Sequence, residues 1–321
     1  MTANCDVDPL AGHAPTRLYA LAVAAGVICG TGAFLTIIHA AAGFQVGVLQ
    51  GIPWGSSLAM ASLVAGLAMM SAVVVSAGSA STWSLVSMAV TTSILTFATA
   101  YSPMVMATLI GQVGRQLSWS PLIAGIPASV IGATYACGSA RRAGAHSEVG
   151  APVHRGGTLP TRLYVRPHRI RTSWGLSLLA AGIAGILLLA SVLWLASHTV
   201  VDPVEVSLMP SGAIASHQFA IIVAVMSGAI LTMSAALSAF GPLVVVTVLM
   251  IVPAAYASVL QLITLGESVT RASLRSITLS APVLGVWGVV VVALVIATVL
   301  ARRDGMACVE RAALAQVDAD T

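Results

Sequence analysis

The sequence predicts an all-α polytopic membrane protein with eight transmembrane helices, arranged as two parallel tandem four-helix repeats. Hydrophobic residues make up 58% of the 321 residues, and charged residues only 7%. A soluble domain carries about 25% charged residues, because water must wet its surface. A double arginine that ends an apolar run occurs twice along the chain, and this recurrence predicts the repeat.

Eight apolar stretches are long enough to cross the hydrocarbon core of a membrane as helices, which takes about 20 residues each. Their hydrophobic residues are continuous rather than alternating, which favours helices over membrane strands. We place the stretches at 18–39, 57–79, 84–110, 121–140, 174–197, 217–239, 242–265 and 280–301.

The first stretch is predicted to be a retained helix rather than a removable signal peptide. Its apolar core exceeds the roughly 7–15 residues of a signal peptide, and its leader carries Asp6 and Asp8 beside Arg17. The second and third stretches are separated only by SAGSASTW (76–83), and the sixth and seventh only by SAFGP (238–242).

The arginines predict the orientation, since the chain contains no lysine. With the N-terminus inside, eleven of the fourteen arginines are cytoplasmic, and only Arg115, Arg271 and Arg275 lie outside. Positive residues concentrate on the cytoplasmic side of membrane proteins. We therefore expect a multi-pass protein of the inner (cytoplasmic) membrane with both termini in the cytoplasm.

Several landmarks recur in the same order. A shift of 161 residues places Arg141-Arg142 on Arg302-Arg303, and a shift of 155 places Tyr101 on Tyr256. Chance alignment of apolar helices is the alternative reading. Because four is an even number, two four-helix repeats have the same orientation in the membrane. The axis that relates the two repeats then runs along the membrane normal. The predicted organisation is a cytoplasmic tail (1–16), repeat 1 (17–144), a basic cytoplasmic linker (145–172), repeat 2 (173–305) and a cytoplasmic tail (306–321).

The loop that joins the repeats is strongly basic. Loop 139–172, which includes the end of repeat 1, holds seven arginines and one acid, Glu148, and its glycines and prolines predict a mostly irregular segment. These arginines either only set the topology or form a docking surface for anionic lipid headgroups or an acidic partner. The candidate docking residues are Arg141, Arg142, Arg155, Arg162, Arg166, Arg169 and Arg171.

The sequence offers few residues that could carry out catalysis or ion transport within the membrane. All ten acids and every arginine lie outside the eight stretches, whereas ion-coupled carriers keep an ionisable group at membrane depth. The sequence shows no catalytic, phosphate-binding or metal-binding motif, so we expect no enzyme activity and no cofactor. Cys29 and Cys137 are expected to lie at different depths and to stay unpaired.

Two features suggest function. Pro103 and Pro253 interrupt corresponding helices, and Gln261 lies on the second of them. Matched interruptions in two repeats are a candidate transport pathway or hinge, although kinks for packing are the alternative. The alternating residues of 44–50 and 204–210 suggest short extracellular strands that a partner strand could join.

The stretch LSAPVLGVWGVVVVALVIATVLARRDGMACVERAAL (279–314) is similar to the final helix and basic tail of actinobacterial FtsX/MacB-type permeases of ABC exporters. The topology of most of the chain also resembles that family. Two features depart from it: the first outer segment is short, and the short links between the second and third helices of each repeat leave no room for a coupling helix. PerM-type cell-division proteins are a second resemblance.

The first resemblance implies a permease-like subunit that moves a hydrophobic or peptide-like substrate with a separate ATPase. The second implies a non-catalytic envelope or cell-division scaffold that binds a single-span membrane partner. Membrane lipids are expected partners in both cases, and nucleic acid is not.

Overall fold

The computed structural model describes residues 16–49, 57–79, 81–101, 121–145, 148–149, 165–166, 174–197, 211–248 and 271–320. Within these ranges the fold is helical and contains eight α-helices. They are α1 (Thr16–Leu49), α2 (Ser57–Ser79), α3 (Trp83–Tyr101), α6 (Pro121–Ala145), α7 (Trp174–Ser197), α9 (Ser211–Met233), α10 (Phe240–Val246) and α12 (Arg271–Asp320).

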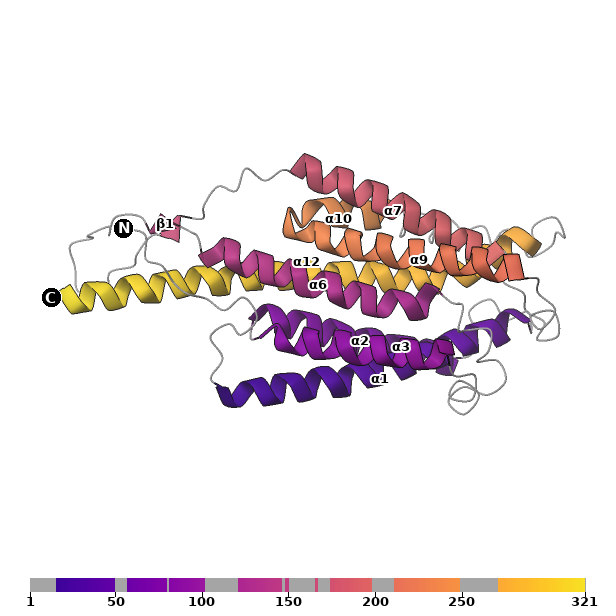
Figure 1. Cartoon of the computed structure of the whole chain (residues 1–321), viewed down its shortest axis with the longest axis horizontal. Coiled ribbons are helices and arrows are strands. Elements are labelled where there is room, and N and C mark those ends of the chain that lie inside the picture. Colours follow the sequence, from indigo (N-terminus) through magenta and orange to yellow (C-terminus); the bar gives the residue numbers. More distant parts are fainter. Residues whose placement is uncertain are drawn as a thin grey trace.

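The helices form one elongated bundle with α6 and α12 at its centre (Figure 1). On one side lie α1, α2 and α3, and on the other lie α7, α9 and α10. Both central helices reach across: α6 packs on α9 and α12 packs on α2. Each sequence half therefore completes its packing with a helix of the other half.

Successive described helices run in opposite directions along the bundle. The ends of α2, α6, α9 and α12 and the starts of α1, α3, α7 and α10 lie toward the same end of the bundle (Figure 1). We call it the arginine end, defined by Arg141, Arg142, Arg302 and Arg303. The last part of α12 continues beyond the other helices and carries the C-terminus.

Several predicted stretches match the helices closely. α2 and α7 cover the predicted 57–79 and 174–197. α9 begins six residues before the predicted start, and a 3₁₀ turn, η1 (Ser234–Ala236), extends it. The described parts of the third and seventh stretches are α3 and α10. The remainders of those two stretches, 102–110 and 249–265, lie outside the described residues.

One expectation is wrong, and the structure adds detail to two others. Residues 44–49 belong to α1 and form no strand, because extending an existing helix adds a hydrogen bond for each residue fixed. α12 runs through most of the predicted tail as one helix of 50 residues. The basic linker holds a short antiparallel pair, β1 (Glu148–Val149) and β2 (Val165–Arg166), with Glu148 opposite Arg166.

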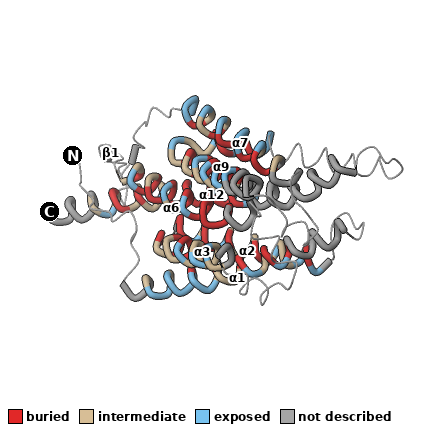
Figure 2. The backbone as a smooth tube through the Cα atoms, turned by 45° about the vertical axis from the view of Figure 1, so that its right-hand side comes forward, coloured by how far each residue is buried: buried red, intermediate tan, exposed pale blue. Residues whose placement is uncertain are grey.

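The buried residues concentrate in the middle of the bundle, where α6 and α12 meet the other helices (Figure 2). Large apolar side chains point outward instead, among them Leu176, Leu179 and Ile183, which are 56–62% exposed. Water would disfavour so much exposed apolar surface. Four described stretches are long and apolar enough to cross a membrane: Tyr19–Ala40, Ala61–Gly78, Trp174–Val192 and Phe219–Ala236. These features indicate a membrane protein.

The links from α2 to α3 and from α9 to α10 are short. In each link a serine hydroxyl oxygen accepts a hydrogen bond at the start of the following helix. The Ser81 hydroxyl oxygen accepts a hydrogen bond from the Trp83 backbone N–H at 3.3 Å, at the start of α3. The Ser238 hydroxyl oxygen accepts one from the Phe240 N–H at 3.2 Å, at the start of α10. A serine oxygen at this position satisfies an N–H group that the first helical turn leaves without a partner.

Candidate functional site

The two copies of the double-arginine motif lie at the crossing of α6 and α12. A Cβ atom added to Gly144 would contact the backbone carbonyl of Arg302 and lie 3.1 Å from the Met306 nitrogen. A Cβ added to Gly305 would contact the backbone carbonyl of Arg141 and lie 2.9 Å from the Ala145 nitrogen. Only glycine allows so close a backbone approach, so these two residues permit the crossing.

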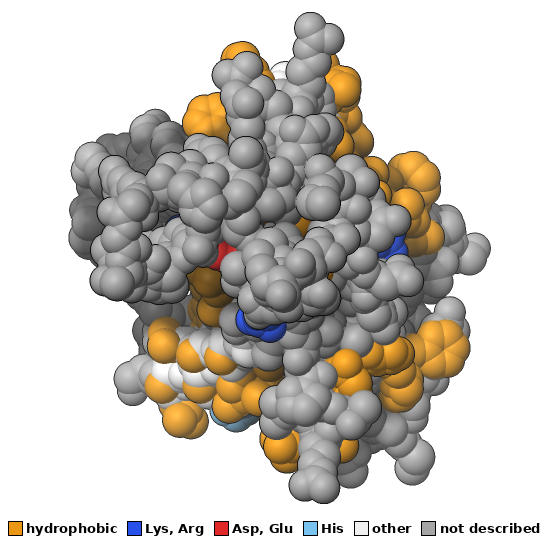
Figure 3. All heavy atoms as spheres, turned by 90° about the vertical axis from the view of Figure 1, so that its left-hand side faces the viewer, with side chains coloured by type: hydrophobic (Ala, Val, Ile, Leu, Met, Phe, Trp, Pro, Cys, Tyr) orange, Lys and Arg blue, Asp and Glu red, His pale blue; other side chains and the backbone are white. Residues whose placement is uncertain are grey.

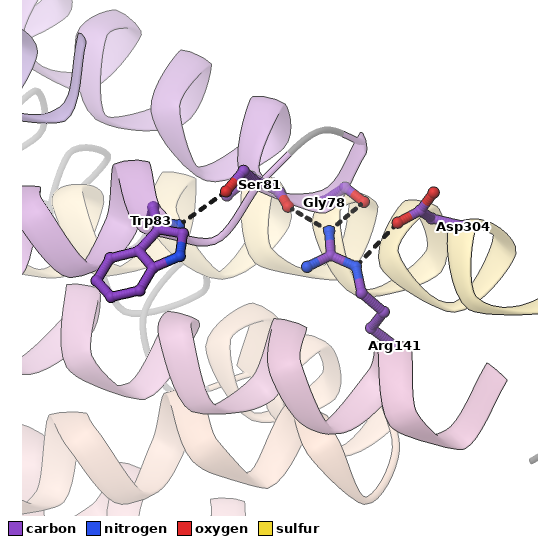
Figure 4. Close-up of polar contacts among 6 residues, drawn as sticks. Gly78, Ser81, Trp83, Arg141 and Asp304 are labelled. Atoms are coloured by element: carbon purple, nitrogen blue, oxygen red, sulfur yellow. Dashed lines mark hydrogen bonds and ion pairs between the residues drawn. The ribbon is translucent and has the colours of Figure 1, made fainter. Parts of the chain in front are cut away.

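Arg141 connects three helices at this crossing (Figure 4). Its side chain is 0% exposed, and its Nε donates to Asp304 Oδ2 at 2.9 Å, forming an ion pair between α6 and α12. Its Nη2 donates to the backbone oxygens of Ala77 at 3.0 Å and Gly78 at 3.5 Å, at the end of α2. Arg141 thereby satisfies carbonyls that the last turn of a helix leaves without partners.

The end of α9, in the other half, is bound by a side chain from a different helix. The Ser177 hydroxyl of α7 lies within reach of two backbone oxygens, Ser234 O at 3.1 Å and Ser238 O at 2.8 Å. Gly241 of α10 makes room for this contact, because an added Cβ would lie 2.7 Å from the Ser177 backbone. A neutral hydroxyl thus ties helices together where the first half uses a charged guanidinium.

The two arginines of each pair have different environments. Arg141 is buried, whereas its neighbour Arg142 is exposed. On α12, Arg302 is half-buried and Arg303 is exposed. Seen from the arginine end, basic side chains reach the surface at separate places, with hydrophobic side chains around them (Figure 3).

The predicted site residues differ in burial, and several of them lie outside the described residues. Arg141 is enclosed by the bundle, so its side chain is not available to an external partner. Arg142 remains accessible, and Arg166 lies in β2. The other candidates lie outside the described residues: Arg155, Arg162, Arg169, Arg171, Pro103, Pro253 and Gln261.

Cys29 and Cys137 are free cysteines, as predicted. Among the described residues, no three His, Cys, Asp or Glu side chains lie close enough together to hold a metal ion. The Arg141–Asp304 ion pair is a polar link between α6 and α12 at the crossing.

Sequence reasoning missed the pairing of Arg141 with Asp304, which lie 163 residues apart. One signal for it was present: the shift of 161 residues aligns the two motifs but places Asp304 on Ala143. An acid beside only one of two otherwise similar arginine pairs indicates a charge partner in the other copy.

Comparison with known proteins gives no relative: no protein-family model, curated protein or solved structure matches this chain.

Proposed function

We propose that the chain crosses the cytoplasmic membrane eight times as two copies of one four-helix unit. The contacts at the crossing support this, because Gly144 meets Arg302 while Gly305 meets Arg141. Such reciprocal contacts are typical of two-fold related surfaces. Ser81 and Ser238 each accept a hydrogen bond from the backbone N–H two residues later, at the starts of corresponding helices. Two copies with the same orientation have a two-fold axis along the membrane normal.

The arginine end faces the cytoplasm in this proposal. It carries exposed arginines directly after apolar helices, which is the arrangement that cytoplasmic segments favour. The start of α1 and the end of α12 lie toward the same end, so both termini are cytoplasmic.

The proposed activity is that of a permease-like subunit, which moves a hydrophobic or peptide-like substrate with energy from a separate ATPase. The observation that carries this proposal is the length of α12. Its 50 residues span about 75 Å at 1.5 Å per residue, whereas the hydrocarbon core is about 30 Å thick. The segment 302–320, which we call the α12 extension, therefore projects into the cytoplasm as a helix continuous with the membrane-spanning part.

The α12 extension can take the place of the coupling helix that this chain lacks. Asp304 lies at its base and is bound to Arg141 of α6, which in turn holds the end of α2. A partner that displaces the extension therefore acts on the crossing of the two halves. Because helices transmit displacement as rigid elements, this provides a mechanical path from the cytoplasm into the membrane.

The test is purification of the tagged chain from its native host in mild detergent, followed by mass spectrometry and ATP hydrolysis measurements. We expect a nucleotide-binding ATPase to co-purify with the full chain and to be lost when residues 312–321 are deleted. A matched control replaces the same ten residues with an unrelated helix-forming sequence. Absence of an ATPase from the full-chain preparation, or its retention after the deletion, would contradict the permease proposal.

A non-catalytic scaffold is the second candidate, and the link between α2 and α3 favours it. Ser81 and Thr82 in this link are 2% and 0% exposed, so these two residues offer no surface to an ATPase. A scaffold would hold a single-span envelope or division protein against its helix faces. In the same purification, that outcome is a single-span protein that stays bound while no ATPase is present.

A further inference from the structure

We infer that Arg142 and Arg303, the exposed members of the two arginine pairs, each bind the headgroup of an anionic phospholipid at the cytoplasmic boundary of the membrane. The acyl chains of these lipids lie along the row of exposed apolar side chains that leads to each arginine. This inference rests on the membrane placement proposed above and is independent of any ATPase.

The first row lies on α6. Ile131 is 46% exposed and Tyr135 is 59% exposed, and Arg142 is exposed seven residues further on. Residues four and seven apart lie on one helix face. Ile131, Tyr135 and Arg142 therefore share one face of α6, with the half-buried Ser139 between the aromatic ring and the guanidinium group.

The second row lies on α12 and repeats the first. Val292 and Ile296 are 43% and 47% exposed, and Arg303 is exposed seven residues after Ile296. Each member stands 161 residues after its counterpart on α6. Val299, which lies between Ile296 and Arg303, is 46% exposed and fills the gap in this row.

The charges favour an anionic lipid over a zwitterionic one. In the segments 141–145 and 302–311, which carry the two arginine pairs, the basic groups outnumber the acidic groups five to two; they are Arg141, Arg142, Arg302, Arg303 and Arg311 against Asp304 and Glu310. Asp304 forms an ion pair with Arg141, so its negative charge compensates the positive charge of that buried arginine. A guanidinium matches the geometry of a phosphate through two parallel N–H donors.

The position also suits a lipid. Arg142 follows the predicted membrane stretch 121–140 by two residues, and Arg303 follows 280–301 by two residues. A long arginine side chain at this depth reaches the headgroup region while its methylene groups stay beside the acyl chains. The two sites belong to corresponding helices, so one lipid is expected for each half.

The test titrates the detergent-purified full chain with phosphatidylglycerol or phosphatidylcholine and counts bound lipids by native mass spectrometry. Each arginine is expected to contribute about fivefold in affinity for the anionic lipid, so Arg142→Gln with Arg303→Gln weakens phosphatidylglycerol binding about 30-fold. Phosphatidylcholine binding should not change. Arg311→Gln is the matched control, because Arg311 lies about 12 Å further along α12 and outside the row.

Two further measurements make the result decisive. The double variant should elute from size exclusion like the parent chain, since both arginines are exposed at the surface of the bundle. Arg142→Lys with Arg303→Lys keeps the charges and should restore most of the affinity. If the double glutamine variant does not fold, the single variants Arg142→Gln and Arg303→Gln replace it, each with an expected loss of about fivefold. Equal phosphatidylglycerol binding by the parent and the double variant, or phosphatidylcholine binding as tight as phosphatidylglycerol binding, would overturn the inference.

Discussion

Arg141 carries a charge in a place that solvent does not reach, and its partners explain how the fold tolerates it. The guanidinium meets one carboxylate and two backbone carbonyls. Removing one member of a buried ion pair costs far more than the pair itself contributes, because the other member remains buried without compensation. Here that member is Asp304, whose side chain is only 16% exposed.

At the residue scale, Arg141→Met is predicted to lower the free energy of unfolding by about 3 kcal/mol. The loss arises from the uncompensated Asp304 carboxylate and from the released carbonyls of Ala77 and Gly78. Unfolding is followed by circular dichroism as SDS is added to the protein in mixed micelles. Arg142→Gln, one residue away but exposed, is the control and should change the midpoint little. Equal midpoints for Arg141→Met and the parent chain would show that the ion pair contributes nothing measurable.

At the element scale, the corner of α7, α9 and α10 depends on one hydroxyl. Ser177→Ala removes a side chain that contacts two backbone oxygens, Ser234 O and Ser238 O. The expected cost is about 1 kcal/mol, as for a typical hydrogen bond. Ser191→Ala is the matched control, because the Ser191 hydroxyl bonds only to Leu188 O of its own helix. In the same SDS titration, Ser177→Ala should unfold earlier than Ser191→Ala, and the reverse order would refute the role of this corner.

The sequence predicted elements with long apolar runs well and predicted their ends less well. α2 and α7 matched because each is a continuous apolar run with polar or small residues at both ends. α12 was expected to end near 301, since Arg302-Arg303 stops the apolar run; arginine ends a membrane-spanning stretch but is a good helix former, so the helix continues. Residues 44–49 were misassigned because a two-residue period over so few positions is weaker than the continuation of α1.

The site was predictable only in part, for a physical reason. Arginines at the end of an apolar run are normally solvated. Nothing in the local sequence SARRAG (139–144) distinguishes Arg141 from Arg142. The burial of Arg141 follows from Gly144 and Gly305, which bring α6 and α12 together and carry Asp304 to it. Such a contact depends on tertiary packing across 163 residues, and one sequence does not encode that pairing in any local pattern.

At the scale of the whole molecule, the two halves are interlocked rather than side by side. α6 packs on α9 and α12 packs on α2, so neither half has a complete core without the other. Arg141 of the first half forms an ion pair with Asp304 of the second half. The central claim is that the crossing of α6 and α12 holds the halves together.

The measurement that tests this claim most directly is cleavage of the linker in the folded protein. A protease site is inserted after residue 158 of the full chain, and the purified protein is cut in mild detergent. A reductant is present throughout, because Cys308 is disulfide-bonded and the bond would otherwise hold the pieces together. Size exclusion then shows whether the two pieces stay together. We predict that they co-elute, and that Gly305→Leu separates them because its side chain would displace the Arg141 backbone. Gly182→Leu is the control and should leave the pieces together, since an added Cβ at Gly182 meets nothing within 4 Å. Separation of the pieces in the unsubstituted chain would contradict the account.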